Sequence, residues 1–250
     1  NKKLINIKEI DPLSIPAWFN KALIKNKTNI NKFIESVSRE PSLHLVFKNE
    51  KSIKYFSEDH IKTTKVSAFL AKKKKIKDIE NYHNGHWWIQ DFSSMLPIYL
   101  SPELESKKIL DMCSAPGGKA FQALSLGGKV ILNDKSKKRI DILKRNLTRL
   151  NLNSEIKNID ALNISSKESF DAVILDSPCS GVGTLRRNPE ILFKKKPPDL
   201  DFLTKIQKDL INKAAKILNR NGLLIYMVCS FLYDETKDIK NKFLKENKNF

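Results

Sequence analysis

The sequence predicts an α/β protein with a parallel sheet, preceded by a small α+β domain. From about residue 107 onward, short apolar strands alternate with amphipathic helices, an order typical of a parallel sheet with right-handed crossovers. The first part of the chain lacks this alternation. We therefore predict a small α+β domain over residues 1–78 and a larger α/β domain over residues 79–250.

Two helices and two strands are predicted in the smaller domain. Pro16 suits the first turn of a helix that carries Trp18 and Leu23 on one side. Apolar residues from 30 to 37 repeat at helical spacing, and residues 43–47 and 65–70 are strand candidates. The four lysines at 72–75 mark the end of this domain. Such a run is usually a solvated surface, and contact with phosphates is the alternative interpretation.

A short segment rich in aromatic residues joins the two predicted domains. Trp87 and Trp88 are expected to pack at the domain junction, and stacking on an exposed base is the alternative. Asp91 is placed to cap a helix that runs to Tyr99.

The larger domain is predicted to contain five strands and four helices. The strands cover residues 108–112, 129–133, 155–159, 170–176 and 223–228. Helices are expected after Gly117-Gly118, over residues 139–150, over a long segment from 203, and over 234–246. Asn221-Gly222 is a typical helix stop, so we expect the long helix to end there.

The composition favours a polyanionic partner. With 46 basic and 28 acidic residues, the net charge is +18, although a general bias toward lysine is the alternative explanation. No apolar run approaches the ~20 residues of a membrane span, and no signal peptide is evident, so no membrane partner is expected. Residue 1 is not Met, which is consistent with a fragment of a longer chain.

Three cysteines at wide spacings predict neither a zinc site nor a redox pair. We therefore expect a reduced, cytoplasmic protein without a metal, and a monomer. In a reduced protein without a metal, a cysteine is either a packing residue or a reactive thiol.

Distinctive residues follow four of the predicted strands, at the edge where ligands bind in open α/β sheets. The first strand leads into a turn with Gly117-Gly118, which lacks both the dinucleotide and the P-loop pattern and suits a carboxylate-bearing ligand such as S-adenosylmethionine. Asp134 is placed to accept ribose hydroxyls, Asp160 to reach an adenine amino group, and Asp176 ends the fourth strand. Each acid alone is more often a cap, but acids at successive strand ends indicate a ligand site.

Two of the cysteines also follow predicted strands. Cys179 comes directly after the strand over 170–176, and Cys229 directly after the strand over 223–228. Packing as a small apolar residue is the simpler interpretation of either cysteine. Together they place two thiols at the reactive edge of the predicted sheet.

Three motifs in this order resemble the signatures of the RNA 5-methylcytosine methyltransferases, and within them the bacterial small-subunit (16S) ribosomal RNA methyltransferase B group (Sun/Fmu). The similarity is strong over residues 80–245 and weak before them, and Trp88–Asp91 and Arg186–Glu190 also match. The motifs are Asp111-Met112-Cys113-Ser114-Ala115-Pro116-Gly117-Gly118-Lys119, Asp176-Ser177-Pro178-Cys179-Ser180-Gly181-Val182-Gly183 and Val228-Cys229-Ser230.

The resemblance implies a Rossmann-like, S-adenosylmethionine-dependent methyltransferase sheet that methylates carbon 5 of a cytosine in RNA, with small-subunit ribosomal RNA as the substrate and a small RNA-binding-type domain in front. It implies that Cys229 is the nucleophile and that Cys179 assists product release, with Val228 where the family has Thr. The family usually continues with further strands that finish the sheet, so the sheet in these 250 residues is expected to be incomplete and the enzyme weakened. The implied cofactor-binding residues are Cys113, Ser114, Ala115, Pro116, Gly117, Gly118, Lys119, Asp134, Asp160 and Asp176.

Several alternatives stay open at this point. Within the family, the substrate can be transfer RNA, and a chain that has lost turnover would be an RNA-binding or ribosome-assembly factor. A DNA cytosine methyltransferase would use the Pro-Cys thiol as its nucleophile and needs a large recognition domain, for which 250 residues leave no room. An amino-methyltransferase would need a polar-Pro-Pro-aromatic turn where Ser177-Pro178-Cys179-Ser180 stands.

Overall fold

The computed structural model describes residues 15–194 and 196–250, which form two compact units. The first unit comprises the described parts of Asn1–Pro41, Pro178–Asp209 and Val228–Phe250. The second comprises Ser42–Ser177 and Leu210–Met227. The division at residue 78 stays a prediction, and each unit is described by itself.

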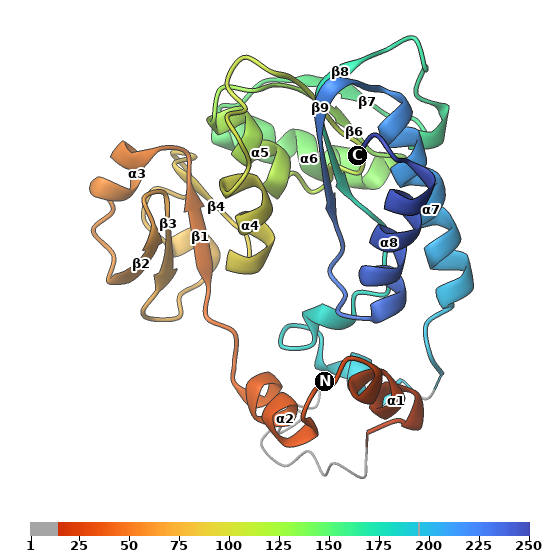
Figure 1. The fold of residues 1–250 in the computed structure, drawn as a ribbon. Coiled ribbons are helices and arrows are strands. Elements are labelled where there is room, and N and C mark those ends of the chain that lie inside the picture. Colours follow the sequence, from red (N-terminus) through yellow and green to blue (C-terminus); the bar gives the residue numbers. More distant parts are fainter. Residues whose placement is uncertain (1–14, 195) are drawn as a thin grey trace. The chain divides into compact units, whose positions relative to one another are not determined.

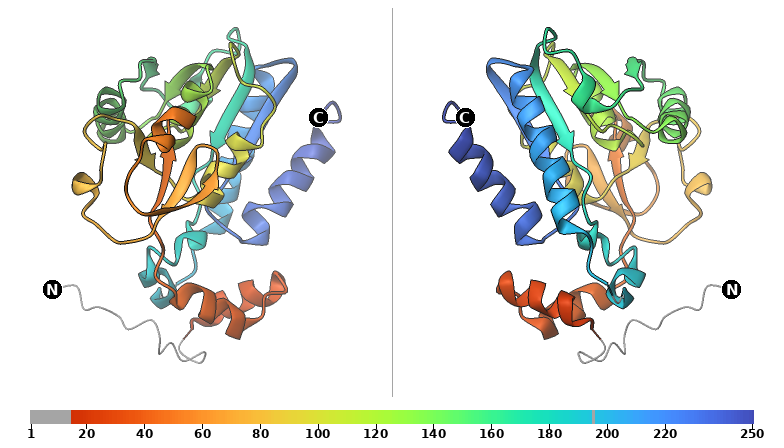
Figure 2. Two further views of the ribbon diagram at one scale, coloured as in Figure 1. Left: turned by 90° about the vertical axis from the view of Figure 1, so that its left-hand side faces the viewer. Right: turned by 90° about the vertical axis from the view of Figure 1, so that its right-hand side faces the viewer.

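The second unit contains the predicted parallel sheet, which is confirmed. Its strands run in the order β7-β6-β5-β8-β9, and every neighbouring pair is parallel. They lie side by side in Figures 1 and 2. Because the chain moves outward from β5 to β7 and then returns to the other side of β5 with β8, the strand order reverses between β5 and β8. The strands are β5 (Lys108–Asp111), β6 (Lys129–Asn133), β7 (Glu155–Lys157), β8 (Phe170–Asp176) and β9 (Leu218–Met227).

The strands of this sheet are apolar because both of its faces are covered. Ile109, Leu132 and Ile174 are fully buried and belong to one core with the apolar side of α6, including Leu143. The helices after β5 and β6 are α5 (Gly118–Ser125) and α6 (Lys137–Leu150), as predicted, and the short helix η4 (Ala161–Asn163) follows β7.

A smaller antiparallel sheet precedes the parallel one within the same unit (Figure 1). Its strands run in the order β2-β3-β1-β4, and β1 and β3 match the two predicted strand candidates. Three short helical segments, α3, η3 and α4, accompany it. The elements are β1 (His44–Phe47), α3 (Glu50–Lys54), β2 (His60–Thr64), β3 (Ser67–Leu70), η3 (Ile76–Asp78), β4 (Trp87–Ile89) and α4 (Phe92–Tyr99).

The two tryptophans of β4 are packing residues. Trp87 is 0% exposed in the core of the small sheet, and Trp88 is 3% exposed in the core of the parallel sheet. The alternative of base stacking is therefore wrong, because neither ring has a free face. Asp91 occupies the N-cap position of α4 as predicted, but its side chain makes no capping hydrogen bond.

One predicted boundary is wrong. The long helix α7 (Leu200–Lys216) ends before Asn221-Gly222, and these two residues lie inside β9. There the pairing of β9 with β8 shifts register, Asn221 has a φ of 62°, and the Asn219 side chain donates to Asp171 Oδ1 at 2.8 Å. Asn-Gly marks a tight turn, which in this chain is an irregularity within a strand and not a helix end.

The first unit has its own core, built around aromatic side chains. Phe19 is fully buried and packs against Phe33 and Phe231 at ring distances of 5.5 and 5.8 Å. None of the helices in the described part of the chain combines the length and apolar character that crossing a membrane requires. The elements of this unit, besides the start of α7, are α1 (Ala17–Lys25), α2 (Ile30–Ser38), η5 (Val182–Thr184), η6 (Pro189–Phe193), η7 (Tyr233–Glu235) and α8 (Lys237–Glu246).

Candidate active-site residues

The turn between β5 and α5 is held in place by the neighbouring chain. Ser114 N donates to Asn133 O at 2.8 Å, the Asn146 amide donates to Pro116 O at 3.0 Å, and Arg139 donates to Ala115 O. Gly117 has a φ of 118°, and a Cβ there would lie 2.0 Å from the Phe121 ring. The turn therefore needs glycine at this position and presents a fixed backbone.

A cluster of charged groups lies at the carboxyl ends of β5 and β8. Lys119 Nζ is 2.6 Å from Asp176 Oδ2. Asp111 is 1% exposed, and its Oδ1 has no hydrogen-bond partner. Burial, and to a smaller extent the negative charge of Asp176, raises the pKa of Asp111 to about 7, while Lys119 opposes the shift. Two predicted residues, Lys119 and Asp176, are thus brought together, and the carboxyl group of Asp111 lies near them.

Asp134 and Asp160 have different surroundings. Asp134 is 2% exposed; its Oδ1 accepts from Ser136 N at 2.9 Å, and its Oδ2 lies 3.3 Å both from Ala115 N and from the Arg139 guanidinium. The Asp134 carboxylate is therefore tied to the predicted turn. Asp160 is exposed, and its Oδ1 accepts from Leu162 N at 3.0 Å as the cap of η4. The role of a ligand for Asp160 stays a prediction beside this capping role.

Cys113 is unsuited to nucleophilic chemistry. Burial, followed by the negative charges of Asp111, Asp134 and Asp176, raises the pKa of the Cys113 thiol to about 12. A thiol must ionise to attack, so Cys113 serves the turn through its backbone and packing.

The other two cysteines form a close pair in the first unit. Cys179 Sγ and Cys229 Sγ are 3.0 Å apart, although 50 positions separate them in the chain, and neither is part of a disulfide. The hydrogen bond to Cys229, with burial as the second cause, raises the pKa of Cys179. Gly183 N donates to Cys229 O at 3.0 Å and holds this backbone from the other side. Cys179 therefore keeps its proton while the exposed Cys229 faces solvent.

Two acidic residues were missed by sequence reasoning. In the sequence, Asp111 is only the first residue of the Asp111–Lys119 motif. Glu235, which is completely buried, looks like an ordinary acid at the start of a helix. No local signal distinguishes Glu235, because its partners Ser180 and Gln207 are 55 and 28 positions away. In residues 15–194 and 196–250, no three His, Cys, Asp or Glu side chains are grouped so that they could hold a metal ion.

Comparison with known proteins agrees with the motifs. The family model of the 16S rRNA methyltransferase RsmB/F matches residues 97–250. The chain belongs to this family. The range matched by the RsmB/F model contains the turn after β5, all three predicted acids and both paired cysteines, whereas the small antiparallel sheet precedes it.

Curated relatives and solved structures extend this picture. The chain is 35% identical over 183 residues to the ribosomal RNA small subunit methyltransferase B of Shewanella oneidensis, covering 71% of this chain and 43% of that relative. It thus spans less than half of the relative's length. Two structures from Pyrococcus horikoshii share the fold. One is a methyltransferase homolog (TM-score 0.73, 21% identity, 94% of this chain and 83% of that chain), and the other is NSun6 with SFG (TM-score 0.77, 17% identity, 93% and 87%).

Proposed function

We propose that this protein uses S-adenosylmethionine to methylate carbon 5 of a cytosine in RNA, with small-subunit ribosomal RNA as the substrate. The observation that carries the proposal is the pair of thiols 3.0 Å apart. Substitution at carbon 5 of a cytosine needs a nucleophile that adds to carbon 6 and a base that later removes the proton from carbon 5, and two adjacent thiols supply both. Membership of the RsmB/F family supports the ribosomal substrate.

The residues after β5, β6 and β8 fit this cofactor. Ser114 Oγ and Asp111 Oδ1 are buried polar atoms without a partner, so the turn has unused hydrogen-bonding capacity. Asp176 and Asp134 supply carboxylates for an amino group and for ribose hydroxyls, and Asp160 one for the adenine amino group. SFG, in the similar NSun6 structure, is an analogue of this cofactor. When bound, S-adenosylmethionine supplies an electrophilic methyl group.

The two thiols divide the work on the base. Cys229 adds as a thiolate to carbon 6 of the cytosine, which makes carbon 5 nucleophilic. Cys179 is suited to the later step, in which the proton on carbon 5 is removed and the bond between carbon 6 and the Cys229 sulfur breaks. The hydrogen bond to Cys229 is the first cause that raises the pKa of Cys179, and it is lost once the Cys229 sulfur is bonded to carbon 6. Cys179 then releases its proton to solvent and, as a thiolate, takes the proton from carbon 5, while the Cys229 sulfur leaves as a thiolate.

Substitution of each thiol tests this assignment. Cys229→Ala should abolish methylation, because no adduct forms. Cys179→Ala should accumulate a covalent RNA–protein adduct that survives a denaturing gel, because release is blocked. S-adenosylmethionine binding by both variants, measured by calorimetry, is the control. An adduct through Cys179 in the Cys229→Ala protein would reverse the two roles.

The substrate is tested separately from the chemistry. Sequencing of 5-methylcytosine in ribosomal and transfer RNA from a strain lacking this protein should reveal the loss of a mark in the small-subunit ribosomal RNA. Loss of a transfer RNA mark alone would favour the alternative substrate. Unchanged marks in both would favour the non-catalytic RNA-binding factor.

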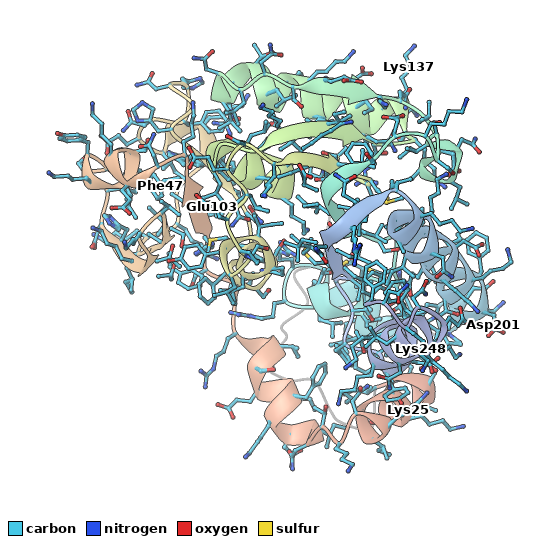
Figure 3. All side chains as sticks on the ribbon, turned by 45° about the horizontal axis from the view of Figure 1, so that its top comes forward. Lys25, Phe47, Glu103, Lys137, Asp201 and Lys248 are labelled. Atoms are coloured by element: carbon cyan, nitrogen blue, oxygen red, sulfur yellow. The ribbon has the colours of Figure 1, made fainter. Side chains whose placement is uncertain are left out.

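We also propose that the small antiparallel sheet contacts the RNA. Lys51, Lys54, Lys62 and Lys65 line a cavity of about 670 Å³ between α3 and β2, with one acid, Glu50, among them. Tyr55 at the same cavity is 63% exposed, so its ring is available to stack on an unpaired base. Exposed lysines occur elsewhere in the same unit as well; Lys137, at the start of α6, is one of them (Figure 3).

A further inference from the structure

A buried carboxylate lies beneath the segment that carries Cys179. Glu235 and Gln207 are both 0% exposed. Glu235 Oε1 accepts from Ser180 N at 2.8 Å and from Gln207 Nε2 at 3.0 Å, and Glu235 Oε2 accepts from Ser180 Oγ at 2.5 Å. We call Ser180, Gln207 and Glu235 the carboxylate clasp.

The carboxylate clasp holds the chain on both sides of Cys179. Gln207 Nε2 also donates to Pro178 O at 2.9 Å, so the residue before Cys179 is bound through Gln207 and the residue after it through Glu235. The residues on either side of Cys179 are therefore tied to two buried side chains that are bonded to each other, and the Cys179 backbone has little freedom.

The same network reaches the segment of Cys229. Ser180 Oγ lies 3.2 Å from Ser230 Oγ, and Ser230 Oγ in turn accepts from Leu232 N at 3.1 Å. The Ser180 hydroxyl is the donor toward both Ser230 Oγ and Glu235 Oε2, and the contact with Glu235 is the shorter of the two. Both thiol-bearing segments are thus connected to one carboxylate.

A carboxylate is a costly choice for such a position. Burying a charge opposes folding, and apolar residues of similar volume are often at least as stable. A carboxylate, however, accepts several strong and directional hydrogen bonds at once, and these bonds fix the positions of its donors. This arrangement is suited to holding two sulfur atoms at a set distance.

We propose that Glu235, acting through Ser180 and Gln207, is a positioning residue that holds the Cys179 sulfur against the Cys229 sulfur. The inference rests on the proposed function for its catalytic consequence, although the positioning itself does not depend on it. Glu235 does not touch the reacting atoms. Its removal leaves both thiols present but lets their separation vary.

The distance between the thiols can be tested without any RNA. Dibromobimane bridges two neighbouring thiols, and mass spectrometry identifies the bridged Cys179 and Cys229 peptides. We expect Glu235→Ala to slow bridging about a hundredfold, since a displacement near 1 Å has an effect of that order on reactions between held groups. Glu235→Gln retains an acceptor for Ser180 N and should slow bridging only about tenfold.

The matched control is the preceding acid. Asp234 pairs with Lys25 at 2.7 Å and is partly exposed, so Asp234→Asn should bridge at the wild-type rate. Thermal unfolding followed by circular dichroism verifies that each variant is folded. A folded Glu235→Ala protein that bridges at the wild-type rate overturns the proposal. If Glu235→Ala does not fold, wild-type bridging rates in both Glu235→Gln and Ser180→Ala overturn it instead.

Kinetics separate positioning from a merely structural role. Glu235→Gln should lower kcat for methylation while the KM for RNA is unchanged, and Asp234→Asn should change neither. A fall in kcat that tracks only the fraction of unfolded protein overturns the proposal. If the wild-type protein bridges rapidly but methylates no RNA, the proposed function fails while the positioning role stands.

Discussion

The proposed cofactor edge of the second unit, formed by the residues after β5, β6 and β8, and the thiol pair of the first unit are both built on carboxylates, but the carboxylates are used differently. At the cofactor edge, Asp176 pairs with Lys119 and Asp134 with Arg139, and Lys119, Asp176 and Arg139 are partly or largely exposed. At the thiol pair, Glu235 is completely buried and accepts three hydrogen bonds from the neutral donors of Ser180 and Gln207.

This difference relates to what each region must do. A partly exposed ion pair contributes little to stability, so a charged ligand can replace one partner at small cost. A buried carboxylate saturated by neutral donors is costly to disturb, and it therefore fixes geometry. We expect substitutions at the cofactor edge to change ligand affinity, and substitutions at the thiol pair to change the rate of reaction.

The largest effect is expected on the free energy of unfolding, when one glycine in each region is replaced by alanine. Gly117→Ala should lower the free energy of unfolding by about 3 kcal/mol, because the new Cβ meets the Phe121 ring and φ is 118°. Gly183→Ala places its Cβ 3.0 Å from Cys229 O, where a small backbone shift relieves it, so it should cost about 1 kcal/mol but slow the bridging of the thiols. Urea unfolding measures both. Equal losses of stability would contradict the contrast.

A second effect separates affinity from rate. Asp176→Asn should weaken S-adenosylmethionine binding about thirtyfold, or roughly 2 kcal/mol, since the charge that faces an ammonium group is lost. The bridging of Cys179 and Cys229 should be unchanged. Calorimetry and the bridging assay measure the two quantities. Asp171→Asn, at the opposite end of β8, is the matched control and should leave cofactor affinity intact. Unchanged affinity in Asp176→Asn would remove Asp176 from the cofactor site.

A third effect appears only as a dependence of stability on pH. The pKa of Asp111 is raised from 3.8 to about 7 in the folded state, so its contribution to stability is fully present below pH 4 and is lost as the pH rises to 7. Asp111→Asn removes this loss of stability, because asparagine does not ionise. The free energy of unfolding of the variant, relative to wild type, should therefore increase by about 3 kcal/mol between pH 5 and pH 8.

The control for this pH dependence has the opposite sign. A hydrogen bond from the Lys108 backbone, followed by one from Asn219, lowers the pKa of Asp171 in the folded state. Its stabilising contribution is present above the unfolded pKa and is lost as the pH falls through the folded value. Asp171→Asn should therefore cost stability at neutral pH and little in acid. Parallel pH profiles for the two variants would contradict the assignment of Asp111.

The features of the fold and of the candidate site that could be predicted are those that the local sequence pattern determines. Continuous apolar runs such as residues 172–175 require a sheet covered on both faces, and acids and cysteines after such runs must lie at its carboxyl edge. Asn221-Gly222 indicated a turn but not whether that turn ends a helix or interrupts a strand. The distance of 3.0 Å between Cys179 and Cys229, and the burial of Glu235, depend on contacts across 28 to 55 positions and have no local signature.

The smallest effect concerns RNA affinity, which we expect to depend neither on the proposed cofactor edge nor on the thiol pair. Replacing Lys51 and Lys62 by Gln should reduce the salt dependence of RNA binding by about 0.7 for each lysine that contacts a phosphate of single-stranded RNA, without changing kcat. Filter binding over a range of salt concentrations measures this slope. Replacing Lys107 and Lys129, two exposed lysines at the amino-terminal edge of the parallel sheet, is the matched control. If both pairs lower the slope equally, the basic character of the whole surface, and not the cavity beside α3, accounts for RNA binding.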